Sequence, residues 1–162
     1  MRRRSILTVS AAAVGGFLAG CLGDEIEEGE TVEVRGTEVP LLSTQRAFDW
    51  YDAGEVLVLD ARSESEWEQL RIADAELSPH PDGLDRGDPT EAVEADTRIM
   101  TYCVCPHTLA GSRAATLIDE GFDSVYALDE GLQDWVEKGH PIEGTGVNDS
   151  VENVEVPEPE YH

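Results

Sequence analysis

The chain of 162 residues carries 35 acidic and 11 basic side chains, a formal net charge of −24 at pH 7, and 40% hydrophobic residues. This length and this apolar fraction suit one domain with a single core. So large a negative charge argues against nucleic acid and anionic membrane surfaces as partners, because both would repel the protein. Such acidity is typical of halophilic proteins, which stay soluble in concentrated salt, and a specific cationic partner is the less favoured alternative.

Residues 1–20 have the pattern of an export signal peptide that ends in a lipobox. Three arginines precede an apolar run at 6–18, which is too short to span a bilayer as a mature helix. The sequence Arg3-Arg4-Ser5-Ile6-Leu7 also looks like a twin-arginine signal. Leu18-Ala19-Gly20-Cys21 resembles a lipobox, so we expect lipid on Cys21 to anchor the protein outside the cytoplasm. The alternative is a cleaved secretory peptide that leaves Cys21 as an ordinary thiol.

Acidic segments flank the expected domain, which runs from 39 to 143. Residues 21–38 hold few large hydrophobic side chains, and we interpret them as an acidic tether between the anchor and the domain. Residues 144–162 include Pro157 and Pro159 and are expected to form an acidic, disordered tail.

Between these segments, strand and helix patterns alternate. In chain order we expect a strand at 39–42, a helix from Ser43 or Thr44 to Gly54, a strand at 56–59, a helix at 64–70, a strand at 75–77, a loop at 80–88, a weak helix at 90–95, a strand ending at Cys103, a helix ending at Gly121, a strand at 124–127 and a helix at 132–138. This alternation predicts an α/β fold, with a mostly parallel sheet of about five strands flanked by helices on both faces. The helical patterns place Trp50, Trp67 and Trp135 in the core.

Cys103 is the candidate nucleophile of this domain. An apolar run ends at this cysteine, a short loop follows, and apolar residues then recur at helical spacing at Ala114, Leu117 and Ile118. Open α/β sheets bind ligands at the carboxyl ends of their strands, and a helix N-terminus favours an anion. This placement stabilises a thiolate, which is the nucleophilic form. The alternative is a buried, inert cysteine.

The stretch around Cys103 resembles the active-site segment of the rhodanese-like sulfurtransferases. In that family a strand ending in Tyr-Cys opens a loop whose backbone amides surround the cysteine sulfur. Asp60-Ala61-Arg62 resembles the family's Asp-x-Arg signature after a strand. The segment 121–141, with Trp135 and the ending Gly139-His140-Pro141, is similar to the family's closing strand, glycine turn and helix.

The resemblance implies that Cys103 carries sulfane sulfur as a persulfide. The sulfur would pass from thiosulfate or a similar small anionic donor to a thiol acceptor, either a small molecule or a protein. The resemblance implies no cofactor, and it assigns Asp60 and Arg62 to structural support by ion pairing. No metal site is expected at Cys103 and Cys105, because His107 alone does not complete a tetrahedral set of ligands. The residues expected at the active-site loop are Val104, Cys105, Pro106, His107, Thr108 and Leu109, with Arg113 in the following helix.

The loop departs from the commonest family pattern, which leaves the donor and acceptor open. Thr108 stands where the family usually has an arginine or another polar residue, and the first arginine is Arg113. We interpret this as a loop with about two extra residues, as in a subset of the family with Cys-x-Cys-Pro. Two roles remain open for Arg113: it binds an anionic substrate, or it pairs with a surface acid.

The role of Cys105 also remains open. In a redox role, Cys105 either forms a disulfide with Cys103 that switches the site off, or accepts sulfur and releases it as that disulfide closes. The alternative is a loop thiol that faces solvent. His107 and His80 are expected to be loop residues that at most help to position substrate.

Cysteine phosphatases and arsenate reductases need arginine six residues after the cysteine, where this chain has Leu109. The main alternative to a sulfurtransferase is an idle or redox-sensing rhodanese module that binds a partner.

Overall fold

The computed structural model describes residues 29–104 and 108–147 of the chain. Its elements are β1 (Thr31–Val34), β2 (Thr37–Leu42), α1 (Thr44–Asp52), β3 (Leu57–Asp60), α2 (Glu64–Gln69), β4 (Arg71–Ile72), β5 (Glu76–Leu77), a 3-10 helix (Pro89–Ala92), β6 (Ile99–Tyr102), α3 (Thr108–Asp119), β7 (Val125–Leu128), α4 (Gly131–Glu137) and β8 (Ile142–Glu143). The expected signal segment with Cys21, and residues 148–162, lie outside the described ranges.

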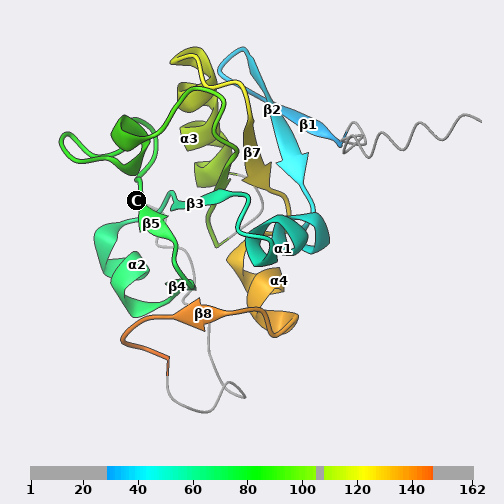
Figure 1. Cartoon of the computed structure of the whole chain (residues 1–162), viewed down its shortest axis with the longest axis vertical. Helices are drawn as coiled ribbons and strands as arrows, with labels where there is room; N and C mark the ends of the chain where they lie inside the picture. The colour runs from blue at the N-terminus through cyan, green and yellow to red at the C-terminus, as the bar shows by residue number, and fades with distance from the viewer. Residues whose placement is uncertain (1–28, 105–107, 148–162) are drawn as a thin grey trace, which may run out of the picture.

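Six strands form the central sheet, in the order β1-β2-β7-β6-β3-β5 (Figure 1). The pairs from β2 to β5 across this sheet are parallel, and β1 is antiparallel to β2. A separate antiparallel pair joins β4 to β8. The expected mostly parallel α/β sheet is therefore confirmed, with one more strand than predicted. β6 is central and has a parallel neighbour on each side, so the residue after it lies at the middle of the carboxyl edge.

The additional strand is β1, which corrects the predicted boundary of the tether. Its alternating sequence turns Val32 and Val34 toward α3, where a Cβ at Gly111 would meet Val34 Cγ2 at 3.3 Å. Arg35 and Gly36 both have positive φ and connect β1 to β2 in a tight turn. Two valines at strand spacing were the signal for this hairpin, and the acidic residues around them masked it.

The other end of the domain also extends further than expected. Residues 144–147 were assigned to the tail, but the Thr145 and Gly146 amides donate to the carbonyls of Glu68 and Gln69 in α2. A Cβ at Gly146 would lie 3.0 Å from the Gln69 carbonyl oxygen. The close approach of two backbones therefore holds this segment against α2.

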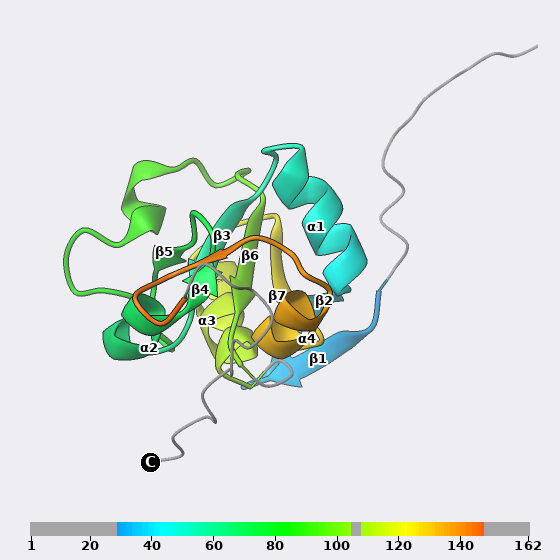
Figure 2. The same cartoon turned by 90° about the horizontal axis from the view of Figure 1, so that it is seen from below.

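Apolar side chains pack on both faces of the sheet. α3 packs on one face with Val39, Leu59 and Ile99, whereas α1 and α4 pack on the other face and lie side by side (Figures 1 and 2). Trp50 and Trp135 are buried as predicted. The expectation for Trp67 was only partly right, because its ring is half-buried and its Nε1–H donates to the Ala75 carbonyl at 2.8 Å.

The starts of α1 and α4 are joined by side chains. Of the two expected caps, Ser43 is the one that caps α1, and its side chain accepts a hydrogen bond from the Arg46 amide. The Glu130 carboxylate, at the start of α4, accepts from the Thr44 amide at 2.8 Å and from the Thr44 hydroxyl at 2.9 Å. Over the described residues, no helix has both the length and the apolar character needed to cross a membrane.

Candidate active site

Cys103 lies at the carboxyl end of the central strand. All four residues of β6 are buried, and Cys103 directly after them is 2% exposed. Its side chain belongs to the apolar cluster on the α3 face, together with Ala110 and Ala114. The thiol therefore lies between the end of a parallel strand and the first turns of the next helix, as the sequence predicted.

The backbone on either side of Cys103 is fixed by neighbouring elements. The Ala61 amide, just beyond β3, donates to the Tyr102 carbonyl at 3.0 Å. The Leu132 amide, in the first turn of α4, donates to the Cys103 carbonyl at 2.8 Å. Gly131 has φ +76°, and a Cβ there would lie 2.5 Å from the Val104 carbonyl oxygen. Only glycine allows α4 to approach the start of the loop so closely.

The predicted loop is described at its two ends. Val104 is buried beside Cys103, Thr108 is exposed at the first position of α3, and Leu109 is half-buried after it. Cys105, Pro106 and His107 lie outside the described residues. α3 has 12 residues and begins at Thr108, so the positive end of its helix dipole lies at the carboxyl side of this loop.

Asp60 and Arg62 form a buried ion pair at the same edge of the sheet. Asp60 Oδ2 accepts from Arg62 Nη2 at 2.6 Å, and Asp60 Oδ1 accepts from Arg62 Nε at 2.9 Å. Arg62 Nη2 also donates to the Leu70 carbonyl at 2.6 Å. Burial alone would lower the pKa of Arg62, but the Asp60 carboxylate outweighs it and raises that pKa. Arg62 therefore stays charged, and the pair ties β3 to the end of α2.

Tyr102 connects this ion pair to the strand that carries the cysteine. Its hydroxyl donates to Asp60 Oδ2 at 2.7 Å and accepts from the Ile72 amide at 3.1 Å. Burial, and then the neighbouring Asp60 charge, raise the pKa of Tyr102 well above its usual value. The phenol thus remains protonated and acts as a fixed hydrogen-bond bridge.

Arg113 has a different environment from either of those expected. It is 1% exposed and forms a buried ion pair with Asp88, whereas a surface acid or an anionic substrate was predicted. Its Nη2 donates to Asp88 Oδ1 at 3.3 Å, and its Nε donates to Ser78 Oγ at 2.9 Å. The guanidinium is therefore engaged with the protein and is not presented to solvent.

Asp88 and Ser78 are residues of this region that the sequence reasoning missed. Ser78 Oγ donates to Asp88 Oδ2 at 2.8 Å, and the same carboxylate accepts from the Leu84 amide and from Thr90. Burial raises the pKa of Asp88, but these hydrogen bonds outweigh it and hold that pKa below its usual value. The sequence Asp88-Pro89-Thr90 was the available signal, because Asp before Pro is typical of a helix N-cap.

His80 follows β5 and is exposed on the loop that leads to Asp88. Its amide donates to the Ala61 carbonyl at 3.0 Å, which keeps the start of this loop near the end of β3. Within 29–104 and 108–147, no group of three or more His, Cys, Asp or Glu side chains is arranged to hold a metal ion.

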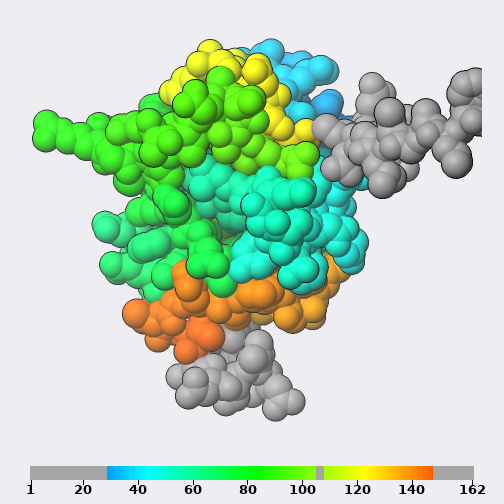
Figure 3. Space-filling view, viewed as in Figure 1, coloured from blue at the N-terminus to red at the C-terminus, as the bar shows by residue number. Residues whose placement is uncertain are grey.

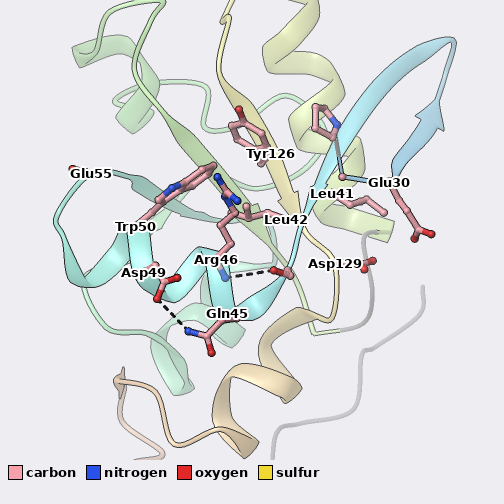
Figure 4. A pocket seen from close by; sticks show the side chains of 13 residues that line it. Glu30, Leu41, Leu42, Gln45, Arg46, Asp49, Trp50, Glu55, Tyr126 and Asp129 are labelled. Carbon is pink, nitrogen blue, oxygen red and sulfur yellow. Dashed lines mark hydrogen bonds between the residues drawn. The ribbon is translucent and has the colours of Figure 1, made fainter. Parts of the chain in front are cut away.

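A separate cavity of about 690 Å³ lies between α1, β2 and β7 (Figure 4). Trp50 and Tyr126 contribute aromatic surface to it, and Arg46 points into it from α1. The described lining contains four carboxylates but no cysteine, and consists of Gly29, Glu30, Pro40, Leu41, Leu42, Ser43, Gln45, Arg46, Asp49, Trp50, Glu55, Tyr126 and Asp129. It is thus distinct from the region around the Cys103 thiol.

Comparison with known proteins agrees with this geometry. The profile of the rhodanese-like domain matches residues 43–138. A solved rhodanese-like domain from Anabaena sp. has 24% sequence identity, covers 76% of this chain and 97% of its own, and has a TM-score of 0.59. A protein of Bacillus halodurans has 20% identity, covers 65% of this chain and 77% of its own, and has a TM-score of 0.56.

The thiosulfate sulfurtransferase of Pseudomonas aeruginosa has the same fold in part of its chain. It has 23% identity and a TM-score of 0.53, and the match covers 65% of this chain but 20% of that enzyme. No curated protein matches the chain significantly. At these identities the structural likenesses show the fold, and the activity has to be argued from the site.

Proposed function

The chain belongs to the rhodanese-like domain family, and from that premise we propose that it is a sulfurtransferase that carries sulfane sulfur on Cys103. One observation carries the proposal: the only cysteine among the described residues lies at the carboxyl end of the central parallel strand, directly before the loop that leads into α3. A thiol in this position is near backbone amides and a helix N-terminus, which favour the thiolate.

The proposed reaction has two displacement steps. In the first, the Cys103 thiolate attacks the outer sulfur of thiosulfate, an S–S bond forms to the enzyme, and the sulfur–sulfur bond of thiosulfate breaks. Sulfite leaves with the electron pair of that bond, and Cys103 becomes a persulfide anion. In the second, the thiolate of an acceptor attacks the outer persulfide sulfur and restores the Cys103 thiolate.

Amides of the loop, from Val104 to Leu109, would stabilise the negative charge on the sulfur in both steps. This role needs no general base, because the persulfide and the thiolate are both anions that N–H groups can bind. Asp60, Arg62 and Tyr102 hold the end of β6 in place, and we assign them structural support without contact to the substrate.

The proposal can be tested by intact mass spectrometry of the full chain with Cys21→Ser, which leaves Cys103 and Cys105 as the thiols. After reduction and exposure to thiosulfate in high salt, we expect a gain of one sulfur, about 32 Da. The gain should persist in Cys105→Ser and disappear in Cys103→Ser. A folded protein that gains no mass with thiosulfate, or gains it equally in Cys103→Ser, would contradict the proposal.

The second candidate is a redox-sensing module, which Cys105 favours because it stands two residues from Cys103. A disulfide between the two cysteines would block the nucleophile, and loss of two hydrogens, about 2 Da, would report it by mass. If oxidation closes this bond but thiosulfate adds no sulfur, the sensor function is favoured over transfer.

The proposed location is outside the cytoplasm, with the protein held at the cell membrane by lipid on Cys21. The twin-arginine pattern and the lipobox are the features of the sequence that support this location. We expect to find the wild-type protein in the membrane fraction. Cys21→Ala should be found either in the soluble fraction or as the unprocessed precursor. Equal distribution of both proteins would contradict a lipid anchor at this residue.

A further inference from the structure

The loop between β5 and the 3-10 helix is held to α3 by a buried group of polar side chains. We call Ser78, Asp88 and Arg113 the Arg113 lock. Arg113 donates to both of the other two, and Ser78 donates to Asp88 at 2.8 Å, so the three side chains form a closed ring of hydrogen bonds. Each of them is at most 5% exposed.

The lock lies beside Cys103 at the same edge of the sheet. In the register of the parallel strands, Leu77, Asp60 and Tyr102 form one row across β5, β3 and β6. Ser78 and Cys103 each come one residue after that row, two strands apart, which places their backbones about 10 Å from each other at the usual strand spacing. Both side chains lie on the α3 face, because Ser78 bonds to Arg113 and Cys103 packs with Ala110.

The lock joins the loop 79–88 to α3, the helix whose Ala110 and Ala114 pack with Cys103. Arg113 belongs to the first half of α3, which continues from the loop after Cys103. Asp88 ends the segment 79–88, which starts at the C-terminal end of β5 and belongs to the part of the chain that projects from the molecule in Figure 3. The relative position of these two segments therefore depends on this contact.

We propose that the Arg113 lock positions the loop 79–88 against α3 and so sets the approach of the sulfur donor to Cys103. The inference rests on the proposed sulfur transfer, and it makes Arg113, Asp88 and Ser78 positioning residues that do not touch the donor. A buried ion pair adds little net stability compared with apolar packing, but its directional bonds can select one geometry. The planar guanidinium of Arg113 forms such directional hydrogen bonds to Asp88 and Ser78.

Gly83 shows how closely the loop is packed on the lock. It has φ +79°, and a Cβ there would clash with Asp88 Oδ2 and lie 2.7 Å from Arg113 Nη2. Gly87 is in the same loop with φ +72°, but a Cβ there would meet nothing within 4 Å. Alanine at either position imposes similar backbone strain, and alanine at 83 alone pushes against the lock.

These two glycines give a matched test, with Ser78→Ala as a milder variant that removes one hydroxyl from the ring. The full chain with Cys21→Ser is mixed with thiosulfate, quenched at short times and weighed, so that persulfide formation is followed without an acceptor. We expect Gly83→Ala and Ser78→Ala to raise the thiosulfate concentration for half-maximal loading roughly tenfold, with the loading rate at saturation within about twofold of wild type. Gly87→Ala should have the wild-type concentration dependence.

The outcomes separate the lock from the proposed function. A wild-type protein that gains no sulfur contradicts the transfer activity itself, and the inference then falls with it. A wild-type protein that loads normally, together with folded Gly83→Ala or Ser78→Ala that load with the same concentration dependence, overturns the inference alone. Lower melting temperatures with an unchanged concentration dependence would likewise assign the lock a purely structural role.

Discussion

Gly131 lies directly against the backbone of Val104, the first residue of the loop after the candidate nucleophile. A Cβ at position 131 would lie 2.5 Å from the Val104 carbonyl oxygen and 3.0 Å from the Cys103 carbonyl oxygen. The next amide, of Leu132, donates to the Cys103 carbonyl. The start of α4 is thus the support on which the beginning of the loop rests.

We therefore expect Gly131→Ala to slow persulfide formation on Cys103 by about tenfold or more, because the added methyl group displaces the loop backbone. Gly139→Ala is the matched control, since Gly139 has φ +73° against +76° for Gly131 and has nothing within 4 Å of a Cβ. The control should lose some stability through backbone strain but load sulfur at the wild-type rate. Equal loading by both variants would show that this contact does not position the loop.

The order of the elements could be predicted because each was marked locally. The four apolar residues before Asp60, the Ser43 cap and the apolar spacing after Cys103 are each patterns that can be recognised within a short stretch of sequence. β1 was missed because its two valines stand among acidic residues, and because its burial depends on α3, far along the chain.

The environment of Arg113 could not be predicted for a related reason. Its partner Asp88 is 25 residues earlier, in a segment whose glycines and prolines indicated a loop but not where the loop would pack. An arginine near a nucleophilic cysteine suggests an anion site, and the sequence holds many acids that are equally plausible partners. The local sequence around Asp60 and Arg62 was more informative, because these two residues bond to each other across one intervening residue.

Removal of Arg62 should destabilise the domain strongly. In Arg62→Met the Asp60 carboxylate stays buried without its cation, which costs about 3–5 kcal/mol of unfolding free energy. Tyr102→Phe should cost less, about 1–3 kcal/mol, because the Ile72 amide then lacks its acceptor. Urea denaturation measures both values.

The exposed ion pair of Lys138 and Asp134 provides the comparison. Lys138→Met should leave the urea midpoint nearly unchanged, because exposed pairs are well screened. If Arg62→Met and Lys138→Met have the same midpoint, the buried pair does not support the end of β3 as we infer.

The lowered pKa of Asp88 predicts a pH-dependent stability. Folding lowers this pKa from the unfolded value of about 3.9, so the folded protein gains stability from Asp88 above about pH 4 and loses it as the pH falls through the folded pKa. Asp88→Asn removes this contribution. The wild type should therefore melt at a higher temperature than Asp88→Asn at pH 6, and this difference in melting temperature should become smaller as the pH falls below about 4.

The exposed Asp82, on the same loop, is the control for this measurement. Asp82→Asn should melt close to the wild-type temperature across the same pH range. A difference between wild type and Asp88→Asn that stays constant down to about pH 2 would contradict an ionised Asp88 in the folded protein.

Salt should stabilise this protein strongly, because its formal net charge is −24. Repulsion among the carboxylates opposes the compact state, and the Debye length falls from about 10 Å at 0.1 M to about 3 Å at 1 M. We expect the melting temperature to rise continuously between about 0.1 M and 2 M potassium chloride.

The control for this salt dependence is a charge-reduced variant, which should melt at a higher temperature than wild type at low salt and should respond less to added salt. Its substitutions, all at exposed positions, are Glu33→Gln, Asp82→Asn, Glu94→Gln, Asp96→Asn and Glu120→Gln. Equal melting temperatures for wild type at low and high salt would contradict the halophilic interpretation, and equal salt responses of the two proteins would show that screening of these charges is not the cause.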